Sequence, residues 1–105
     1  GMNQMEQWTG ETFYQYLKSG KKGAFYLYTP LCGTCQVAGK MLEVITKLLP
    51  DLPIGKADIN YLPEIAETFF IESVPCLVLF NEHQVKEKIY AFQDVPYLYE
   101  KLKKL

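Results

Sequence analysis

Short apolar runs alternate along this chain with longer segments in which apolar residues recur every three or four positions. Continuous apolar runs are typical of buried strands, whereas the wider spacing is typical of helices that pack one face against a core. The runs predict strands at 5–8, 24–29, 54–59, 76–80 and 85–90.

Helix ends are marked by glycine, which adopts left-handed backbone at little cost, and by polar residues that cap the first turn. Strands that alternate with helices indicate an α/β protein with helices on the faces of a sheet. The apolar spacing and these markers together predict one helix through Phe13 and Leu17 that stops at Ser19-Gly20, one from Cys32 or Gly33 to Leu49, one capped by Asn60 and one capped by Asp94.

The composition is that of one compact domain. Of 105 residues, 49% are apolar or aromatic and 22% are charged, a balance that excludes disordered and collagen-like chains. Eleven lysines and twelve carboxylates leave a net charge of −1, so no basic field is available to bind nucleic acid. The longest apolar stretches fall far below the length of about twenty residues that spans a bilayer, so we expect no membrane partner.

The first residues of the chain carry neither a basic leader nor an apolar run, so we expect no signal peptide and a cytoplasmic protein. A glycine before Met2 is typical of a cleaved tag, and we interpret residues 1–3 as this scar and a tail. Residues 4–105 then form a single domain, which we expect to be a monomer. The number of cysteines is small and odd, which argues against a secreted disulfide framework and for redox chemistry or simple burial.

The sequence Cys32-Gly33-Thr34-Cys35 lies where a predicted strand turns into a predicted helix. Cysteines three residues apart share one face of a helical turn, so a disulfide between them can form and open. At the helix start, unpaired backbone N–H groups and the helix dipole favour the thiolate of Cys32. Cys35 lies one turn deeper, where burial disfavours its charged form. We therefore predict that Cys32 is the attacking thiol and Cys35 the resolving thiol.

These four residues, together with Ser73-Val74-Pro75 further along the chain and the apolar strand that follows, resemble the thioredoxin family. The resemblance covers residues 4–105. It implies the thioredoxin fold, with a central mixed β-sheet of about five strands flanked by four helices. It also implies a cis peptide bond at Val74-Pro75 that faces the first cysteine, because only an X–Pro bond makes the cis form cheap.

The resemblance implies an activity as well. The family reduces protein disulfides by dithiol-disulfide exchange, which maintains cell redox homeostasis, and here Cys32 and Cys35 would carry that reaction. The implied partners are disulfide-containing proteins and a recycling enzyme such as a thioredoxin reductase. No cofactor and no metal is implied. The residues at the family's substrate groove are Leu31, Val74, Pro75 and Ala91.

One departure from the family pattern concerns proton transfer. Tyr26 stands at the usual position of a buried aspartate that helps to move the proton of the second cysteine, and a phenol is a poor base at neutral pH. Lys56 matches the lysine that accompanies this aspartate, and Asp58 points the same way from the same strand. An altered proton relay is therefore an alternative, and we expect slower resolution by Cys35.

The surface around the cysteines departs from the pattern too. Leu31 stands at the position of a usual tryptophan and Ala91 at that of a usual glycine. Thr34 replaces a proline and keeps a backbone N–H that could reach the sulfur of the first cysteine. Phe70 and Glu72 replace residues that are often glycine and a basic residue. We expect a substrate surface that is bulkier and more acidic than usual.

Other interpretations stay open. Cys32, Cys35, Cys76 and His83 could nominally form a zinc site, although metal motifs usually bring paired ligands in both halves. Cys76, directly after Pro75, could lie close to the pair and form an alternative disulfide, or it could be a packing residue. The domain could also be a non-catalytic module that holds a partner in its groove, or a disulfide oxidase or isomerase, which would need an oxidising compartment.

Overall fold

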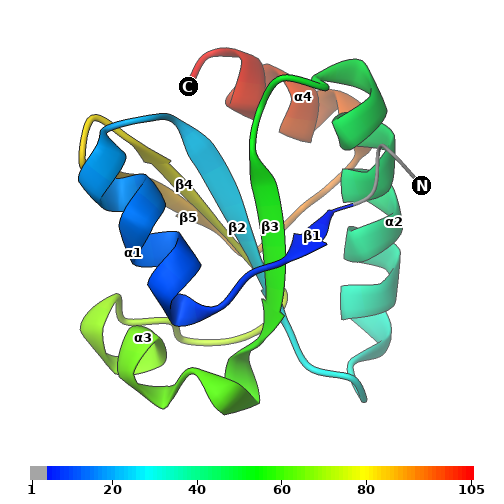
Figure 1. Cartoon of the computed structure of the whole chain (residues 1–105). Coiled ribbons are helices and arrows are strands. Elements are labelled where there is room, and N and C mark those ends of the chain that lie inside the picture. Colours follow the sequence, from blue (N-terminus) through cyan, green and yellow to red (C-terminus); the bar gives the residue numbers. More distant parts are fainter. Residues whose placement is uncertain (1–4) are drawn as a thin grey trace.

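A central β-sheet organises residues 5–105, the part of the chain that the computed structural model describes (Figure 1). Residues 1–3, interpreted above as a tag scar and tail, lie outside the described residues. Within the described part the strands are β1 (Glu6–Gln7), β2 (Gly23–Tyr28), β3 (Ile54–Asp58), β4 (Cys76–Asn81) and β5 (Gln84–Ile89).

The sheet is mixed, as predicted. Its strand order is β1-β3-β2-β4-β5 across the five strands of the described chain. The pairs β1 with β3 and β2 with β3 are parallel, whereas β4 pairs antiparallel with both β2 and β5. The two apolar strands, β2 and β4, are therefore neighbours inside the sheet. All but the last residue of each is buried, and strands that are buried on both faces are apolar throughout.

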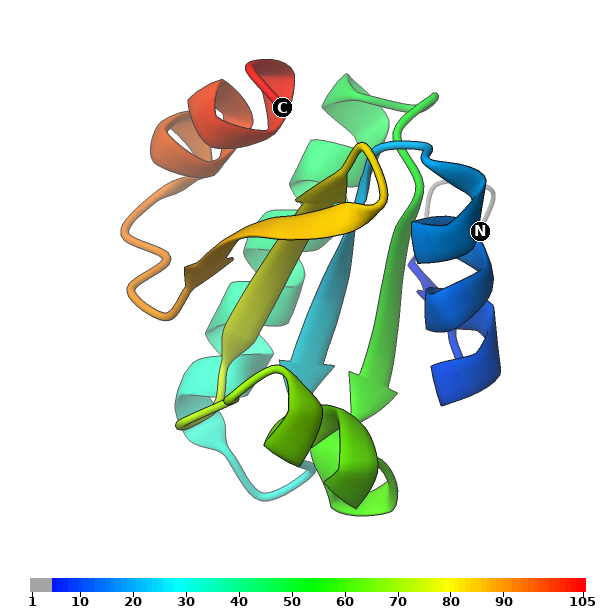
Figure 2. The same cartoon turned by 90° about the vertical axis from the view of Figure 1, so that its left-hand side faces the viewer.

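Helices cover both faces of the sheet. Figures 1 and 2 show α1 and α3 on one face and α2 and α4 on the other. Their bounds, for residues 5–105, are α1 (Gly10–Ser19), α2 (Gly33–Leu48), α3 (Pro63–Thr68) and α4 (Val95–Lys103), and a single 3-10 turn spans Ile59–Tyr61. No helix of this described part is both long and apolar enough to span a membrane.

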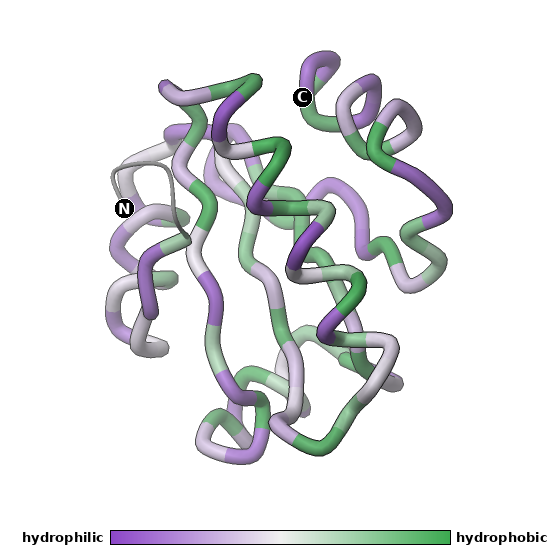
Figure 3. Tube along the Cα trace, turned by 90° about the vertical axis from the view of Figure 1, so that its right-hand side faces the viewer, coloured by the Kyte–Doolittle hydropathy of each residue, from purple (hydrophilic) through white to green (hydrophobic). Residues whose placement is uncertain are grey.

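Each face of the sheet has its own core, because successive side chains of a strand point to opposite sides. Tyr26 and Leu77 belong to the core under α2 and α4, together with Leu42 and Leu98. Figure 3 shows hydrophobic and hydrophilic residues alternating along α2, as a helix with one buried face requires. The other core, under α1 and α3, contains Trp8, Phe13, Phe25, Leu27, Ile65, Cys76, Val78 and Phe80 among others.

Two predicted helix ends are confirmed and one is wrong. Gly20 ends α1 with a left-handed φ of 79°, and Asp94 caps α4 by accepting a hydrogen bond from the backbone N–H of Tyr97 at 2.9 Å. Asn60 caps no α-helix. The carboxylate of Asp58 instead accepts from the backbone N–H of Asn60 at 2.9 Å, which starts the 3-10 turn, and α3 begins only afterwards at a proline.

Smaller differences concern element boundaries. The second helix stops one residue early, because Leu49 leaves helical geometry at its C-terminal cap while its N–H still reaches Ile45. Strand β3 ends at Asp58 since Ile59 already belongs to the 3-10 turn. β1 is only two residues long. None of these shifts changes which residues face the cores.

Candidate active site at the start of helix α2

Cys32 and Cys35 form a disulfide at the turn between β2 and α2, with their Cα atoms 5.2 Å apart. Cys32 is the N-cap residue of α2, in extended backbone, and Cys35 lies in the first helical turn. Gly33 and Thr34 are exposed between them, and an added Cβ at Gly33 would meet nothing within 4 Å. The helix start therefore leaves Cys32 accessible to solvent, with no side chain at Gly33 to cover it.

The sulfur of Cys32 lies next to two hydrogen-bond donors of the same turn. The backbone N–H of Cys35 points at it from 3.1 Å. The hydroxyl of Thr34 lies 3.4 Å away. Thr34 was expected to act through its backbone N–H, but the contact found is made by its side chain. Donors of this kind stabilise a thiolate relative to a thiol once the disulfide is reduced.

The two cysteines differ in exposure. Cys32 is half-buried, whereas Cys35 is buried, with 4% of its surface exposed. A partner disulfide can therefore reach the sulfur of Cys32 more readily than that of Cys35. This asymmetry fits an attacking and a resolving thiol.

Tyr26 lies directly behind the pair in β2 and is 3% exposed. Its hydroxyl donates a short hydrogen bond to the carbonyl of Cys35. The ring stacks on Tyr28, with 5.6 Å between centroids, and meets the edge of Phe92 at 5.9 Å. Burial, reinforced by Tyr28, raises the pKa of Tyr26 to about 12. The phenol therefore stays protonated at neutral pH and positions the helix start instead of acting as a base.

The two other residues suggested for a proton relay have separate environments. Lys56 of β3 lines the same small cleft as Tyr26 and Cys35. Asp58 uses its carboxylate on the backbone N–H of Asn60, as described above. The same cleft is also lined by Gln36, Gly39, Lys40 and Glu43 of α2, which the sequence reasoning missed. The spacing of four residues from Cys35 to Gly39 and on to Glu43 is the signal that could have found them.

The residues expected to form a substrate groove lie at the same end of the sheet. Val74-Pro75 is a cis peptide bond, as the resemblance implied, and both residues are half-buried. Figure 2 shows the loop before β4 and the turn before α2 at one end of the sheet. Leu31 is 99% exposed, and Ala91 is exposed as well. Both side chains are therefore open to solvent at this end of the sheet, and no other described residue covers them.

The loop before the cis peptide carries an exposed aromatic residue. Phe70 is 74% exposed and has a positive φ of 54°, the left-handed region in which glycine is common. The ammonium of Lys88 donates to the carbonyls of Phe69 and Phe70, at 2.8 and 3.0 Å. Glu72 is exposed two residues further along. The surface is thus bulkier and more acidic than glycine and a basic residue would make it.

Cys76 does not lie beside the redox pair. It is fully buried in β4, within the core under α1 and α3, whereas Tyr26 belongs to the core on the opposite face. Burial raises the pKa of the Cys76 thiol to about 11. The idea of an alternative disulfide is therefore wrong, because strand alternation directs this side chain away from α2. Cys76 is a packing residue.

The zinc alternative has no support in residues 5–105. No three His, Cys, Asp or Glu side chains of this part cluster in a way that could hold a metal ion. His83 lies in the turn between β4 and β5, where its Nδ1 is 3.1 Å from the carbonyl of Leu17. His83 therefore contacts the end of α1 and is not part of the cysteine site.

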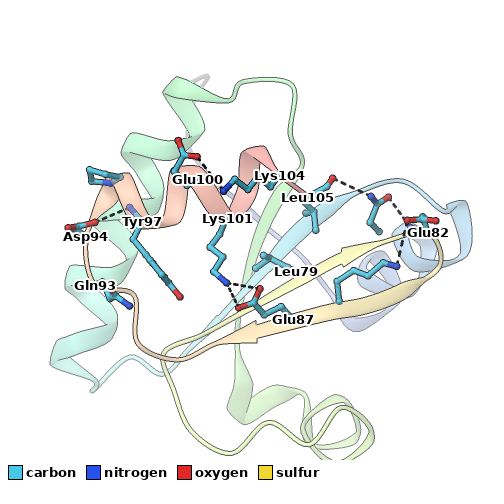
Figure 4. Close-up of a pocket in the computed structure, with 13 residues that line it drawn as sticks. Leu79, Glu82, Glu87, Gln93, Asp94, Tyr97, Glu100, Lys101, Lys104 and Leu105 are labelled. Atoms are coloured by element: carbon cyan, nitrogen blue, oxygen red, sulfur yellow. Dashed lines mark hydrogen bonds and ion pairs between the residues drawn. The ribbon is translucent and has the colours of Figure 1, made fainter.

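A larger hollow, of about 930 Å³, lies between β5 and α4 (Figure 4). The ammonium of Lys101 binds the carboxylate of Glu87 across it at 2.9 Å and lies 5.8 Å from the ring centre of Tyr97. Lys104 and Glu100 form a second, longer pair at 4.0 Å. These charges already have partners, and neither redox cysteine lines the hollow. We assign it no part in the cysteine chemistry.

Comparison with known proteins shows the family of this chain. The family model described as Thioredoxin matches residues 4–104. A thioredoxin-like protein of Bacillus subtilis, YusE, is 51% identical over 78 residues, which cover 74% of each chain. The thioredoxin of Chlamydia pneumoniae is 28% identical over 86% of this chain and 87% of its own.

A solved structure supports the fold alone. The oxidised mitochondrial thioredoxin 3 of Saccharomyces cerevisiae superimposes with a TM-score of 0.85 over 96% of this chain and 95% of its own, at 24% identity. The matching fold, the disulfide at the start of α2 and the relatives with a shared sequence lead to one conclusion. The chain belongs to the thioredoxin family and is a thiol-disulfide oxidoreductase.

Proposed function

We propose that this chain reduces disulfides of partner proteins, with Cys32 as the attacking thiol and Cys35 as the resolving thiol. One observation carries the proposal: the two sulfurs are already bonded to each other in the first turn of α2, one of them half-buried and the other buried. Such a pair stores two electrons when it is reduced and releases them when the disulfide closes.

The reaction begins at the thiolate of Cys32. It attacks one sulfur of the partner disulfide, forms a mixed disulfide and releases the other partner sulfur as a thiolate, which takes a proton from water. Cys35 then loses its proton and attacks the sulfur of Cys32. The bond between Cys32 and the partner breaks, the second partner sulfur leaves with the electron pair, and the Cys32–Cys35 disulfide closes. The partner gains two electrons and two protons.

The turn around Cys32 supports the first step. The N–H of Cys35 and the hydroxyl of Thr34 both lie within hydrogen-bonding range of its sulfur, and the start of α2 adds the positive end of a helix dipole. Both features favour the thiolate of Cys32 over its thiol once the disulfide is reduced. Gly33 leaves the approach to the sulfur open.

The groove residues complete the proposal. We infer that Val74 and Pro75 align an extended segment of the partner and that Leu31 and Ala91 contact it from either side. The oxidised pair needs a reductase of the thioredoxin reductase type to recycle it, and the reaction suits a reducing compartment such as the cytoplasm. The thiols carry the chemistry, so we expect no cofactor.

Insulin reduction in the presence of dithiothreitol tests this function. We expect the parent protein to accelerate precipitation of the insulin B chain and the Cys32→Ser variant to fall to the rate of dithiothreitol alone. Cys76→Ala is the matched control, because it also removes one thiol but lies in the opposite core, and it should retain the activity. Equal rates for the parent and Cys32→Ser would leave a binding module as the better interpretation.

A further inference from the structure

A small cleft opens beside Cys35, between α2 and the strands β2 and β3. Its volume is about 340 Å³, which leaves room for several water molecules. Cys35 is buried, so this cleft is a route by which its thiol can exchange a proton with solvent without passing Cys32. Its walls include Tyr26 and Tyr28 of β2, Lys56 of β3, and Gly39, Lys40 and Glu43 of α2.

The helix period places three of these residues in a row. Cys35, Gly39 and Glu43 are four residues apart and lie on one face of α2. Gly39 has no side chain, so a trough runs along the helix from the cysteine to the glutamate. The ring of Tyr26 forms the side wall, since a Cβ at Gly39 would lie 3.7 Å from it. Glu43 is exposed to solvent and lines the cleft, and helical side chains in general lean towards the N-terminus, which in α2 is the cysteine turn.

The charges around the cleft leave one candidate base. Lys40 and Lys56 are cations and cannot accept a proton at neutral pH. The hydroxyl of Tyr26 donates its hydrogen bond to the carbonyl of Cys35, and burial raises the pKa of Tyr26 to about 12. The hydroxyl of Tyr28 accepts from the side chain of Gln7 at 2.9 Å. Among the described residues that line the cleft, the carboxylate belongs to Glu43 alone.

We propose that Glu43, acting through water in this cleft, takes up the proton that Cys35 must lose before it attacks the mixed disulfide. The inference rests on the proposed function, because it concerns the second step of that reaction. The thiol of Cys35 gives its proton to cleft water, which passes it to the carboxylate of Glu43 and then to bulk solvent. The thiolate, favoured by Lys40 and Lys56 nearby, then displaces the partner sulfur from Cys32.

Glu43 does not touch the reacting atoms, so it is a positioning residue for the proton and not a catalytic one. This separates it from Tyr26, which holds the main chain of Cys35 without exchanging a proton. Glu43 of α2 thus supplies the base, and Tyr26 of β2 aligns the thiol.

A stopped-flow reaction of the reduced protein with dithiobis(nitrobenzoate) tests the inference. Attack by Cys32 releases the first chromophore at a rate proportional to reagent, and attack by Cys35 releases the second at a rate independent of it. We expect Glu43→Gln to slow the second phase about fivefold below pH 7 and to leave the first phase unchanged. The effect is smaller than the rate enhancement of a general base that is hydrogen-bonded directly to the reacting group, because Glu43 acts through water. Added acetate, a small base able to enter the cleft, should restore the lost rate.

The controls make the result decisive. Glu64→Gln, an exposed glutamate in the first turn of α3, should match the parent in both phases. Glu43→Asp should retain part of the second-phase rate, because it keeps the carboxylate. An unchanged second phase and pH profile in Glu43→Gln would overturn the inference while leaving the proposed function intact. Release of only one chromophore per parent molecule would overturn the proposed function, and the inference with it.

Discussion

Tyr26 shows how one residue changes the chemistry of a familiar site. An aspartate at this position would bring a base next to Cys35, whereas the phenol brings a hydrogen-bond donor that the Cys35 carbonyl accepts. The consequence is a fixed helix start without a buried charge. Charged groups remain near the second cysteine, but they lie around the cleft, on Lys40, Glu43 and Lys56.

The alkaline stability of the protein tests this environment. Burial raises the pKa of Tyr26 from 10.0 to about 12, so the folded state holds the phenolic proton more tightly than the unfolded state does. Its stabilising effect is therefore complete below pH 10 and disappears as the pH rises through 12. Tyr26→Phe should lose about 1 kcal/mol at pH 8, through the missing hydrogen bond.

The comparison is made by urea unfolding of the parent and of Tyr26→Phe at a series of pH values. The parent should lose its advantage between pH 10 and 12, and Tyr26→Phe should become the more stable of the two near the top of that range. A difference between the two proteins that stays constant with pH would show that the phenol does not titrate as a buried group.

At the scale of elements, the sequence predicts best where burial is complete. Strands β2 and β4 were predicted to within one residue at each end, because runs that are apolar on both faces have no alternative environment. The short helix start was predicted at Asn60 and lies instead at Pro63, since Asp58 captures the backbone N–H of Asn60 first. Which of two neighbouring polar residues caps a turn depends on backbone geometry that the residue types do not determine.

The cap of α4 gives a prediction at this scale. The carboxylate of Asp94 accepts the backbone N–H of Tyr97, and α4 buries Leu98 and Leu102 against the core shared with α2. Asp94→Ala should lower the free energy of unfolding by about 1 kcal/mol, seen as a lower urea midpoint at unchanged slope. Asp94→Asn keeps a capping oxygen and should lie close to the parent. Equal losses in both variants would indicate a role other than capping.

For the whole molecule, the candidate site could be predicted only in part. Cys32 and Cys35 are the first and last residues of one four-residue motif, and a short second motif implies the cis peptide, so both could be predicted from the sequence. The cleft was not, because it forms only when the topology sets Tyr26 beside Lys56 of a neighbouring strand. For a related reason the sequence left two alternatives open for Cys76, proximity to the redox pair and core packing. Its closeness in sequence to Pro75 says nothing about which face of β4 it occupies.

The topology also explains why the two cysteines differ in exposure. Strand β2 is the central strand of the sheet, and the chain passes from its end into α2. Cys32, at the N-cap of α2, is half-buried, whereas Cys35, in the first turn, packs against the core. At the N-cap, the sulfur of Cys32 is accessible to a partner and lies near two hydrogen-bond donors. The sulfur of Cys35 is shielded from solvent by the core. A two-step exchange needs that difference.

Trapping of the mixed disulfide tests the central claim most directly. The Cys32→Ser and Cys35→Ser variants are each incubated with insulin, separated without reducing agent, and mapped by mass spectrometry. We predict that Cys35→Ser accumulates a covalent complex through Cys32, while Cys32→Ser, left with a thiol that is 4% exposed, accumulates little. Equal amounts of complex through Cys35 in the second variant would contradict the assignment of attacking and resolving thiols.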